Sequence, residues 1–408
     1  MSKTKPIKLK MSKRDRTKRW ERWLAIAAIV TIVIAWFVGA TLEANDTMPA
    51  IEAAMPTADR FENLGNDTFA AYTNQSEEEL IGYVTLGEAV GYGGPMVVAV
   101  GVDLAGNVVG TAVSDHVETP SYFKRVMDAN FIDQLLAKPY DDPFQIGEDL
   151  DGITGATYTV SALANATLNG SQIVAGQQLG LAVEAPPPTK IVFGIPEITV
   201  LALYIVGYFA HQRKFKYKKQ ARWAMLITGL VVLGFWFNLP LTISKINTFL
   251  LGFWPQWQTN LYWYFLLGGI FFVLTVDNKN AYCSWFCPFG AAQECMGAIG
   301  GAKISGPRKY RRFFLWLQRG LAWGAIVIAL LFRNPGLSSY EVFGTLFSFT
   351  GSTIMFGLLG IILVMSLFVK RPWCNFLCPL DPVYDIIRLV RGWTMDFVKN
   401  ARKGAAAS

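Results

Sequence analysis

Four of the five cysteines occur in two copies of one short motif. The copies, 91 residues apart, are CSWFCP (283–288) and CNFLCP (374–379). Cysteines four residues apart share one face of a helix, and the proline that follows turns the chain away and leaves two thiolates at an exposed helix end. Two such pairs supply four thiolates, the ligand set of an iron–sulfur cluster or a Cys₄ zinc site. We therefore predict four metal ligands: Cys283, Cys287, Cys374 and Cys378.

The chemistry of thiolates leaves three interpretations of these motifs open. On the softness of thiolate ligands, we favour an iron–sulfur cluster over the two alternatives, a structural zinc site and unmetallated packing cysteines. Cys295, the fifth cysteine, has no partner in the second copy. We interpret it as a small, buried, apolar residue.

A second candidate for chemistry is the polar stretch DGITGAT at 151–157. Its glycine–alanine pair lets a bulky group approach the backbone closely, and its last threonine offers a hydroxyl to which a group could be attached. Local hydrogen bonds from an aspartate and a threonine can orient such a loop. An ordinary Gly-Thr turn is the alternative. The candidate residues are Asp151, Thr154, Gly155, Ala156 and Thr157.

Two upstream stretches accompany this loop, GYGGPM (91–96) and HVETP (116–120). The second stretch contains His116, Glu118 and Thr119, and by itself His116 could be a buried, hydrogen-bonded histidine. The chain has only two histidines. A cytochrome with two bis-histidine haems needs four, so that class of protein is excluded, whereas a single histidine-ligated haem is not.

The composition is that of a membrane protein with one polar part. Hydrophobic residues make up 52% of the 408 positions and charged residues 16%, compared with about a quarter charged in soluble domains. A membrane-spanning helix needs about 20 apolar residues. Six stretches meet this length approximately: 23–40, 191–210, 223–239, 260–276, 313–332 and 353–369.

The distribution of charge predicts how these spans are oriented. Of the 37 Lys and Arg residues, 29 fall on one face of a six-span arrangement, including the N-terminal segment 1–22. By the positive-inside rule that face is cytoplasmic and carries both termini. Residues 41–190 then face outward, with 21 acidic and five basic side chains. The net charge of +7 thus reflects basic anchors beside membrane lipid, and we predict no nucleic-acid partner.

The chain divides accordingly into a first span (23–40), an outward α+β domain (41–187) and a five-span membrane domain (188–408). An uncleaved first span is favoured over a signal peptide because its apolar run is near spanning length. In the outward domain we predict a hairpin around 103–107, a helix over 120–137 and a stiff proline linker at 184–190.

The membrane domain contains an internal repeat. A shift of 91 residues carries the span at 223–239 almost onto the start of the span at 313–332, and carries the first Cys-x₃-Cys-Pro motif onto the second. Spans three and four with one motif therefore match spans five and six with the other. Paired halves of this kind usually form a site at their interface.

The stretch at 151–157 resembles the flavinylation motif Asp-x-x-(Ser/Thr)-Gly-Ala-Thr of subunits in the Rnf and Na⁺-translocating NADH:quinone oxidoreductase complexes (RnfG and NqrC). The resemblance implies that the final threonine, Thr157, carries FMN through a phosphoester that a flavin transferase installs outside the membrane. HVETP also resembles the family's His-x-Glu-Thr-Pro, which implies that His116, Glu118 and Thr119 shape the flavin-binding pocket. Ser121 stands where that family usually has glycine.

The whole arrangement, over about 60–395, resembles NosR/NirI-type membrane FMN-binding proteins. In layout it is closer to their short RdhC/PceC relatives, which lack the C-terminal ferredoxin domain. The resemblance implies a multi-pass protein of the bacterial inner membrane with a periplasmic FMN domain. We expect an electron carrier or oxidoreductase component rather than a stand-alone enzyme.

The functional hypothesis is a transmembrane electron-transfer flavoprotein. Electrons pass from a cytoplasmic or quinol donor through the cysteine-ligated centre to FMN and on to a periplasmic reductase or its maturation. A membrane redox sensor with the same cofactors and a zinc-stabilised assembly factor are the alternatives. The two centres are expected on opposite sides of about 30 Å of hydrocarbon, which is too far for one efficient electron hop. Either the cluster lies deep in the bilayer, or a quinone, a haem or a second flavin bridges the gap. Glu197 is a weak candidate for a quinol proton acceptor, with a wet helix end as the preferred alternative.

Overall fold

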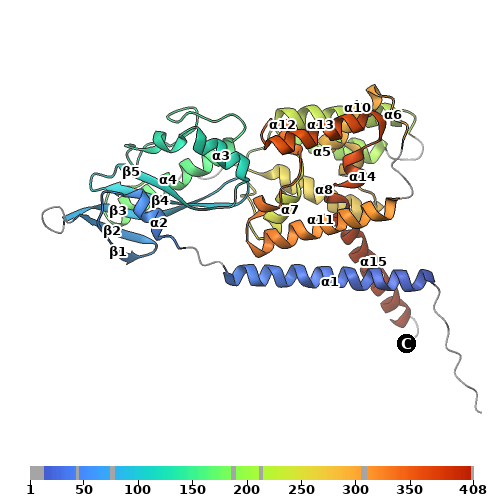
Figure 1. Ribbon diagram of the computed structural model, residues 1–408, viewed down its shortest axis with the longest axis horizontal. Helices are drawn as coiled ribbons and strands as arrows, with labels where there is room; N and C mark the ends of the chain where they lie inside the picture. Colours follow the sequence, from blue (N-terminus) through green and yellow to red (C-terminus); the bar gives the residue numbers. More distant parts are fainter. Residues whose placement is uncertain are drawn as a thin grey trace, which may run out of the picture.

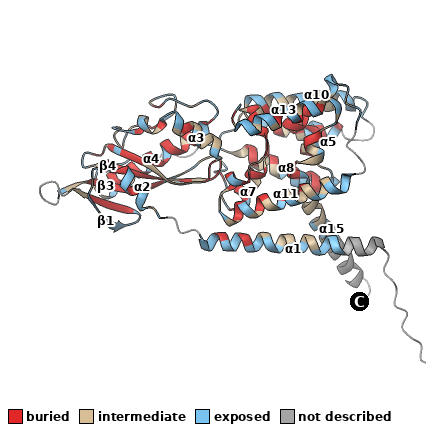
Figure 2. Cartoon of the chain, in the orientation of Figure 1, coloured by how far each residue is buried: buried red, intermediate tan, exposed pale blue. Residues whose placement is uncertain are grey.

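The computed structural model describes residues 13–42, 46–73, 79–184, 190–210, 215–304 and 310–405. Figure 1 shows a sheet-containing domain beside a domain of packed helices, with the long helix α1 (Lys13–Leu42) running along the helical domain. The apolar side chains of α1 are largely exposed, as Figure 2 shows for most of its length. An exposed apolar helix of this kind fits a lipid environment.

The domain that the sequence predicts to face outward, called the outward domain below, is built on one five-stranded antiparallel sheet with the strand order β1-β2-β3-β4-β5. Helix α4 (Thr157–Gln177) packs on one face of the sheet and α2 (Met48–Ala54) on the other. The interior strand β4 is therefore buried on both faces, which explains its almost continuous apolar sequence PMVVAVGVD. The strands are β1 (Arg60–Gly65), β2 (Thr68–Thr73), β3 (Glu79–Val90), β4 (Pro95–Asp103) and β5 (Val108–His116).

The hairpin predicted around 103–107 is confirmed by the pairing of β4 with β5. Asp103 Oδ1 closes the turn by accepting hydrogen bonds from the backbone N–H groups of Ala105 (2.9 Å) and Asn107 (2.8 Å). The helix predicted over 120–137 is shorter than expected. It divides into α3 (Pro120–Asp128) and a 3₁₀ turn (Phe131–Leu135) because Asn130 adopts a left-handed conformation. Most of the predicted linker, 185–189, lies outside the described residues.

The second domain is helical and has one extensive apolar core. Its elements are α5 (Ile195–Ala210), α6 (Lys218–Thr228), the π-helix η2 (Gly229–Trp236), α7 (Ile243–Leu250), α8 (Leu261–Asp277), α9 (Ala281–Trp285), α10 (Pro288–Ile299), α11 (Arg311–Leu331), η4 (Pro335–Ser338), α12 (Phe343–Phe347), α13 (Thr353–Phe368), α14 (Pro372–Phe376) and α15 (Leu380–Ala405). The apolar stretch expected at 223–239 is therefore divided between α6 and η2.

Among the described residues, two helices are long and apolar enough to cross a membrane, Trp20–Leu42 and Arg311–Leu331. The pair Leu261–Asp277 and Ala281–Ile299, bent by 98°, is a third if it forms one broken span. Ile195–Ala210 and Thr353–Phe368 are apolar but shorter. The fold thus combines an antiparallel sheet domain with apolar helices, and the number of six spans stays a prediction.

The predicted repeat is confirmed in the elements that surround the cysteines. Moving α9 by 91 residues gives 372–376, the bounds of α14. The same shift places α8 at 352–368, within one residue of the start of α13. Each short helix ends at a break, and a longer helix, α10 or α15, begins at or just after the proline.

Candidate functional site

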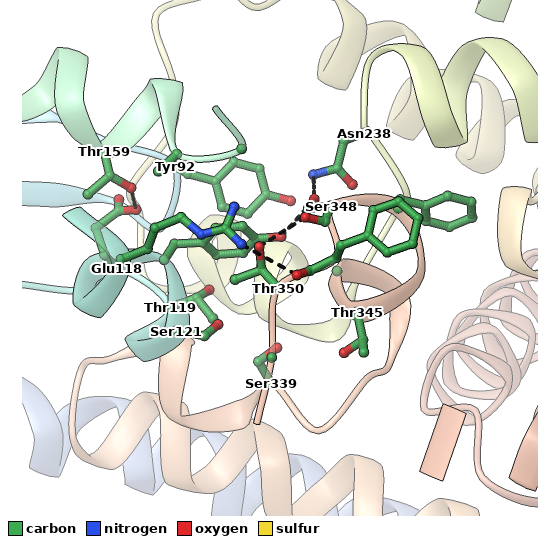
Figure 3. Close-up of a pocket in the computed structure, with 18 of the residues that line it drawn as sticks. Tyr92, Glu118, Thr119, Ser121, Thr159, Asn238, Ser339, Thr345, Ser348 and Thr350 are labelled. Atoms are coloured by element: carbon green, nitrogen blue, oxygen red, sulfur yellow. Dashed lines mark hydrogen bonds between the residues drawn. The ribbon is translucent and has the colours of Figure 1, made fainter. Parts of the chain in front are cut away.

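A cavity of about 1300 Å³ lies where the outward domain meets the helical domain (Figure 3). The outward domain contributes the loop before α4 and the turn that leads into α3. The helical domain contributes residues from 235–244 and 336–355. Of the predicted cofactor-binding residues, six line this cavity: Glu118, Thr119, Thr154, Gly155, Ala156 and Thr157.

Direct hydrogen bonds hold the two domains together around this cavity. The Tyr122 hydroxyl lies 3.1 Å from Ser348 Oγ, which also accepts a hydrogen bond from Asn238 (Figure 3). Lys245 Nζ donates to the carbonyl of Tyr92 at 2.9 Å. The helical domain is therefore a structural wall of the site, and no signal in the motif itself indicated these partners.

Thr157 is the first residue of the 21-residue helix α4, and its side chain is exposed to the cavity. Unpaired N–H groups and the helix dipole make a helix N-terminus favourable for a phosphate. Gly155 precedes it with φ +82°, and a Cβ at Gly155 would lie 2.7 Å from Arg125 Nη1. Arg125 in turn donates to the Thr154 carbonyl at 3.0 Å. A phosphate on the Thr157 hydroxyl therefore fits this corner.

Glu118 is only 1% exposed and is held from two sides. Its Oε1 accepts from the backbone N–H of Gly93 at 2.9 Å and its Oε2 from the Thr159 hydroxyl at 2.7 Å. Burial raises the pKa of this carboxyl, against the opposing effect of these hydrogen bonds and of Lys245. A Cβ on Gly91 would lie 2.2 Å from Glu118 Oε1, so a glycine in GYGGPM makes room for the acid.

His116 and Asp151, also predicted to bind the cofactor, are not among the described residues that line the cavity. The His116 ring stacks on Phe123, with centroids 3.6 Å apart. Burial lowers the pKa of His116, and Asp115 opposes that shift. The Asp151 backbone N–H donates to Gln134 at 2.8 Å. Both residues support neighbouring segments, and their predicted roles in binding FMN stay predictions.

The four motif cysteines line a second cavity, of about 300 Å³, inside the helical domain. Cys283 belongs to α9 and Cys374 to α14, whereas Cys287 and Cys378 follow the breaks after these helices. The backbone N–H of Cys287 bonds to the carbonyl of Tyr282 at 2.8 Å, and the equivalent bond in the second copy is 3.0 Å. The repeat thus presents the two cysteine pairs in the same local geometry.

The expectation that the thiolates end at exposed helix termini is wrong for the second cysteine of each motif. Cys287 and Cys378 are 5% and 6% exposed. The proline does turn the chain, but it turns α10 back against η2 and α13 rather than into solvent. Cys295 lies on α10, half-buried, and is not among the described residues that line the cavity.

Polar groups surround the cysteines in the manner expected for an anionic metal centre. Gln293 Nε2 lies 3.4 Å from Cys374 Sγ, and Arg371 Nη1 donates to the carbonyl of Cys283 at 2.6 Å. Arg371 also pairs with Glu294 at 2.6 Å. Cations and hydrogen-bond donors near ligating sulfurs tune the potential of an iron–sulfur cluster.

The size of this cavity tests which metal centre fits. Its volume is on the order of ten times the about 30 Å³ that one water occupies in the liquid. In the described residues, no group of three or more His, Cys, Asp or Glu side chains is arranged to hold a metal ion. Four cysteines around a roomy cavity fit a multi-atom cluster better than a single zinc ion held at about 2.3 Å from each sulfur.

The two cavities share one short segment of chain. Glu341 and Gly344 line the cavity at the domain interface, whereas Phe343 lines the cysteine cavity. The Phe343 ring lies 4.7 Å from that of Phe289. One turn further along α12, Phe347 again lines the interface cavity. The five residues of α12 span about 7.5 Å, so the cavities lie on either side of one small helix.

This arrangement places the two cavities on either side of one short helix, whereas the sequence predicted centres on opposite sides of the bilayer. The segment at 333–352 connects the fifth and sixth predicted spans and is folded into the helical domain, where Val342 and Phe343 are buried. Its aromatic sequence, YEVFGTLFSF, is a signal that favours burial. Glu341, Phe343 and Arg371 were not predicted as site residues.

Comparisons with known families agree with this division. A family model described as an FMN-binding domain matches residues 91–171. A second, described as a 4Fe-4S binding domain, matches residues 259–307 and 352–395. The first match contains the stretch at 151–157, and the two parts of the second each contain one cysteine motif.

Three similar proteins differ in their names, and one of them is named as an electron transport protein. Protein NirI of Paracoccus denitrificans is 32% identical over 205 residues, which cover 44% of this chain and 28% of NirI. Regulatory protein NosR of Pseudomonas aeruginosa is 26% identical over 213 residues, 46% of this chain and 28% of NosR. Putative electron transport protein YccM of Escherichia coli is 28% identical over 134 residues, 29% of this chain and 37% of YccM. Each match therefore spans less than two thirds of the relative's length.

A flavin domain and a two-part iron–sulfur domain, each with its own cavity, define the class as an electron-transfer protein. Within that class, the matches support a NosR/NirI-type FMN and Fe–S membrane protein.

Proposed function

We propose that this protein carries electrons between an iron–sulfur cluster held by its four motif cysteines and FMN attached to Thr157. A cytoplasmic or quinol donor supplies the electrons, and a periplasmic reductase or its maturation receives them. The observation that carries the proposal is the short helix α12, whose residues line both cavities. A short path lets the two centres exchange electrons without a further carrier between them.

The chain's own residues have distinct tasks in this scheme. Thr157 provides the hydroxyl for the phosphoester, and the N-terminus of α4 stabilises the phosphate. Glu118, fixed by Gly93 and Thr159, forms one wall of the cavity between the two domains. This cavity is called the flavin cavity below, because the proposal places FMN in it. Bound FMN supplies one- and two-electron chemistry, which suits a carrier between a cluster and a two-electron partner.

Around the cysteines, packing and charge set the conditions for a cluster. Phe289, Phe343 and Trp373 are almost fully buried and exclude water from one side of the cavity. Arg371 places a cation beside the sulfurs. Because a cation stabilises the more negative, reduced form of a cluster, it favours electron acceptance at this position.

Covalent attachment at Thr157 is tested by expression with and without a flavin transferase, followed by a denaturing gel read by flavin fluorescence. The wild-type chain should fluoresce only with the transferase. Thr157→Ala should lose the band, and the matched variant Thr157→Ser, which keeps a hydroxyl, should retain it. Covalent fluorescence in Thr157→Ala would show that the attachment site is elsewhere.

The name of NosR as a regulatory protein favours a second candidate, a membrane redox sensor that uses the same two centres. Metal analysis separates both redox roles from a zinc-stabilised assembly factor. Iron with visible-range cluster absorption is expected. Zinc without iron would contradict the electron-transfer route.

A further inference from the structure

Glu341 is a buried acid that the scheme above does not use. It lies in the segment shared by the two cavities and is 5% exposed. Its Oε2 accepts a hydrogen bond from the backbone N–H of Ile243 at 2.7 Å. Its Oε1 is buried and has no hydrogen-bond partner within the described part of the chain. Because Glu341 lines the flavin cavity, a group bound there can form a hydrogen bond with the unpartnered oxygen of this acid.

The surroundings of Glu341 keep it neutral. The titratable groups near enough to feel the charge of Glu341 are the phenols of Tyr92 and Tyr340 and the thiol of Cys378. The cation Lys245 interacts electrostatically with Glu118, and its Nζ donates a hydrogen bond to the Tyr92 carbonyl. Burial raises the pKa of Glu341 to about 8, against the opposing hydrogen bond from Ile243. At neutral pH the carboxyl therefore holds a proton.

Two other buried acids, Glu118 and Glu197, do not combine an unpartnered oxygen with a place in the lining of the flavin cavity. Both oxygens of Glu118 already accept hydrogen bonds from the protein, so neither is left without a partner as Glu341 Oε1 is. Glu197, the acid expected from the sequence to exchange protons, caps its own helix by accepting from the Gly194 N–H at 2.8 Å. It is not among the described residues that line the flavin cavity.

We propose that Glu341 is the proton-exchanging residue of the flavin cavity. The inference rests on the proposed function, because it needs FMN in this cavity and the cysteine-ligated cluster as the reductant. Two electrons arrive from the cluster, which is oxidised one electron at a time. The O–H bond of Glu341 breaks, an N–H bond forms on the flavin, and the carboxylate remains. When a two-electron acceptor outside the membrane reoxidises the flavin, the N–H bond breaks and the proton returns to Glu341.

The position of Glu341 supports this role. Phe343, two residues further along the chain, lines the cysteine cavity, so electrons and the proton enter the flavin cavity through the same segment. A neutral carboxylic acid in a dry site can give up its proton as negative charge develops beside it. The proton moves only within the cavity, so the two added electrons leave one negative charge on the singly protonated flavin and one on the Glu341 carboxylate.

Infrared spectroscopy on the full-length protein tests the proposal. In the flavin-free protein, a carbonyl absorption of a protonated carboxyl is expected at pH 7. It should disappear as the pH rises through about 8. The Glu341→Gln variant should lack this absorption, whereas Glu197→Gln, which removes a buried acid outside the cavity, should retain it. The same titration in Glu341→Gln would overturn the proposal.

A second measurement uses the flavin-loaded protein reduced by dithionite. Reduction should bleach the protonated-carboxyl absorption in the wild-type chain and in Glu197→Gln, and should produce no bleach in Glu341→Gln. A bleach that survives Glu341→Gln in a protein that binds and reduces flavin would refute the inference alone. A wild-type chain that binds no flavin would refute the proposed function, and the flavin-free titration would still decide the protonation of Glu341.

Discussion

The two cavities of this protein are built in different ways. The cysteine cavity lies within one domain and is formed by two copies of the same motif, so its geometry is repeated locally in α9 and α14. The flavin cavity lies between two domains, and residues far apart in the sequence, such as Tyr122 and Ser348, close it. The first depends on the packing of a core and the second on the docking of one domain against another.

The largest expected effect concerns the cysteine cavity. Replacing any one of the four ligands, for example Cys287→Ser, should remove most of the bound iron, because a cluster of this kind is held by four thiolates. Cys295→Ser is the matched control and should retain full iron, as measured by metal analysis of the purified protein. Equal iron in all five single variants would refute the four-ligand assignment.

The packing difference between the cavities predicts a contrast between two phenylalanines. Phe343 is 1% exposed beside the cysteines, whereas Phe349, at the edge of the flavin cavity, is 69% exposed. Phe343→Ala should lower the free energy of unfolding by about 3–5 kcal/mol. Phe349→Ala should change it by about 0.5 kcal/mol or less. Thermal unfolding in detergent measures both, and equal losses would show that Phe343 is not part of a packed core.

A pair of glycines sharpens the requirement at the flavin cavity. Gly155 and Gly147 have similar left-handed φ values, +82° and +89°. Alanine at either position costs about 1–2 kcal/mol of backbone strain. Only at Gly155 would the added Cβ meet a neighbour, Arg125 Nη1 at 2.7 Å. Gly155→Ala should therefore lower covalent flavin, read by in-gel fluorescence, more than Gly147→Ala does. Equal loss in both would mean that backbone strain alone is responsible.

The smallest expected effect is on the potential of the cluster. Arg371→Gln removes a cation from the cysteine cavity and should lower the midpoint potential by about 60 mV, the equivalent of about 1.4 kcal/mol for one electron. Arg371→Lys keeps the charge and should lie closer to the wild-type value. Redox titration of the cluster absorption measures the shift. A potential unchanged in Arg371→Gln would show that this cation does not act on the cluster.

The sequence predicted the parts of these sites that are local. The Cys-x₃-Cys-Pro spacing, its repetition after 91 residues and the turn at Asp103 are encoded within a few residues. The walls could not be predicted in this way. Glu341 and Phe343 reach the cavities because the segment at 333–352 folds into the helical domain, which depends on contacts distant in sequence. The same holds for Arg371, whose partner Glu294 lies on another helix.

The central claim is that electrons pass between the two cavities within one molecule. Rapid mixing of the holoprotein with a reductant that reacts with the cluster, followed by flavin absorbance, tests it directly. The account predicts flavin reduction at a rate independent of protein concentration and abolished by Cys287→Ser. A rate that rises in proportion to protein concentration, or that survives in Cys287→Ser, would contradict it.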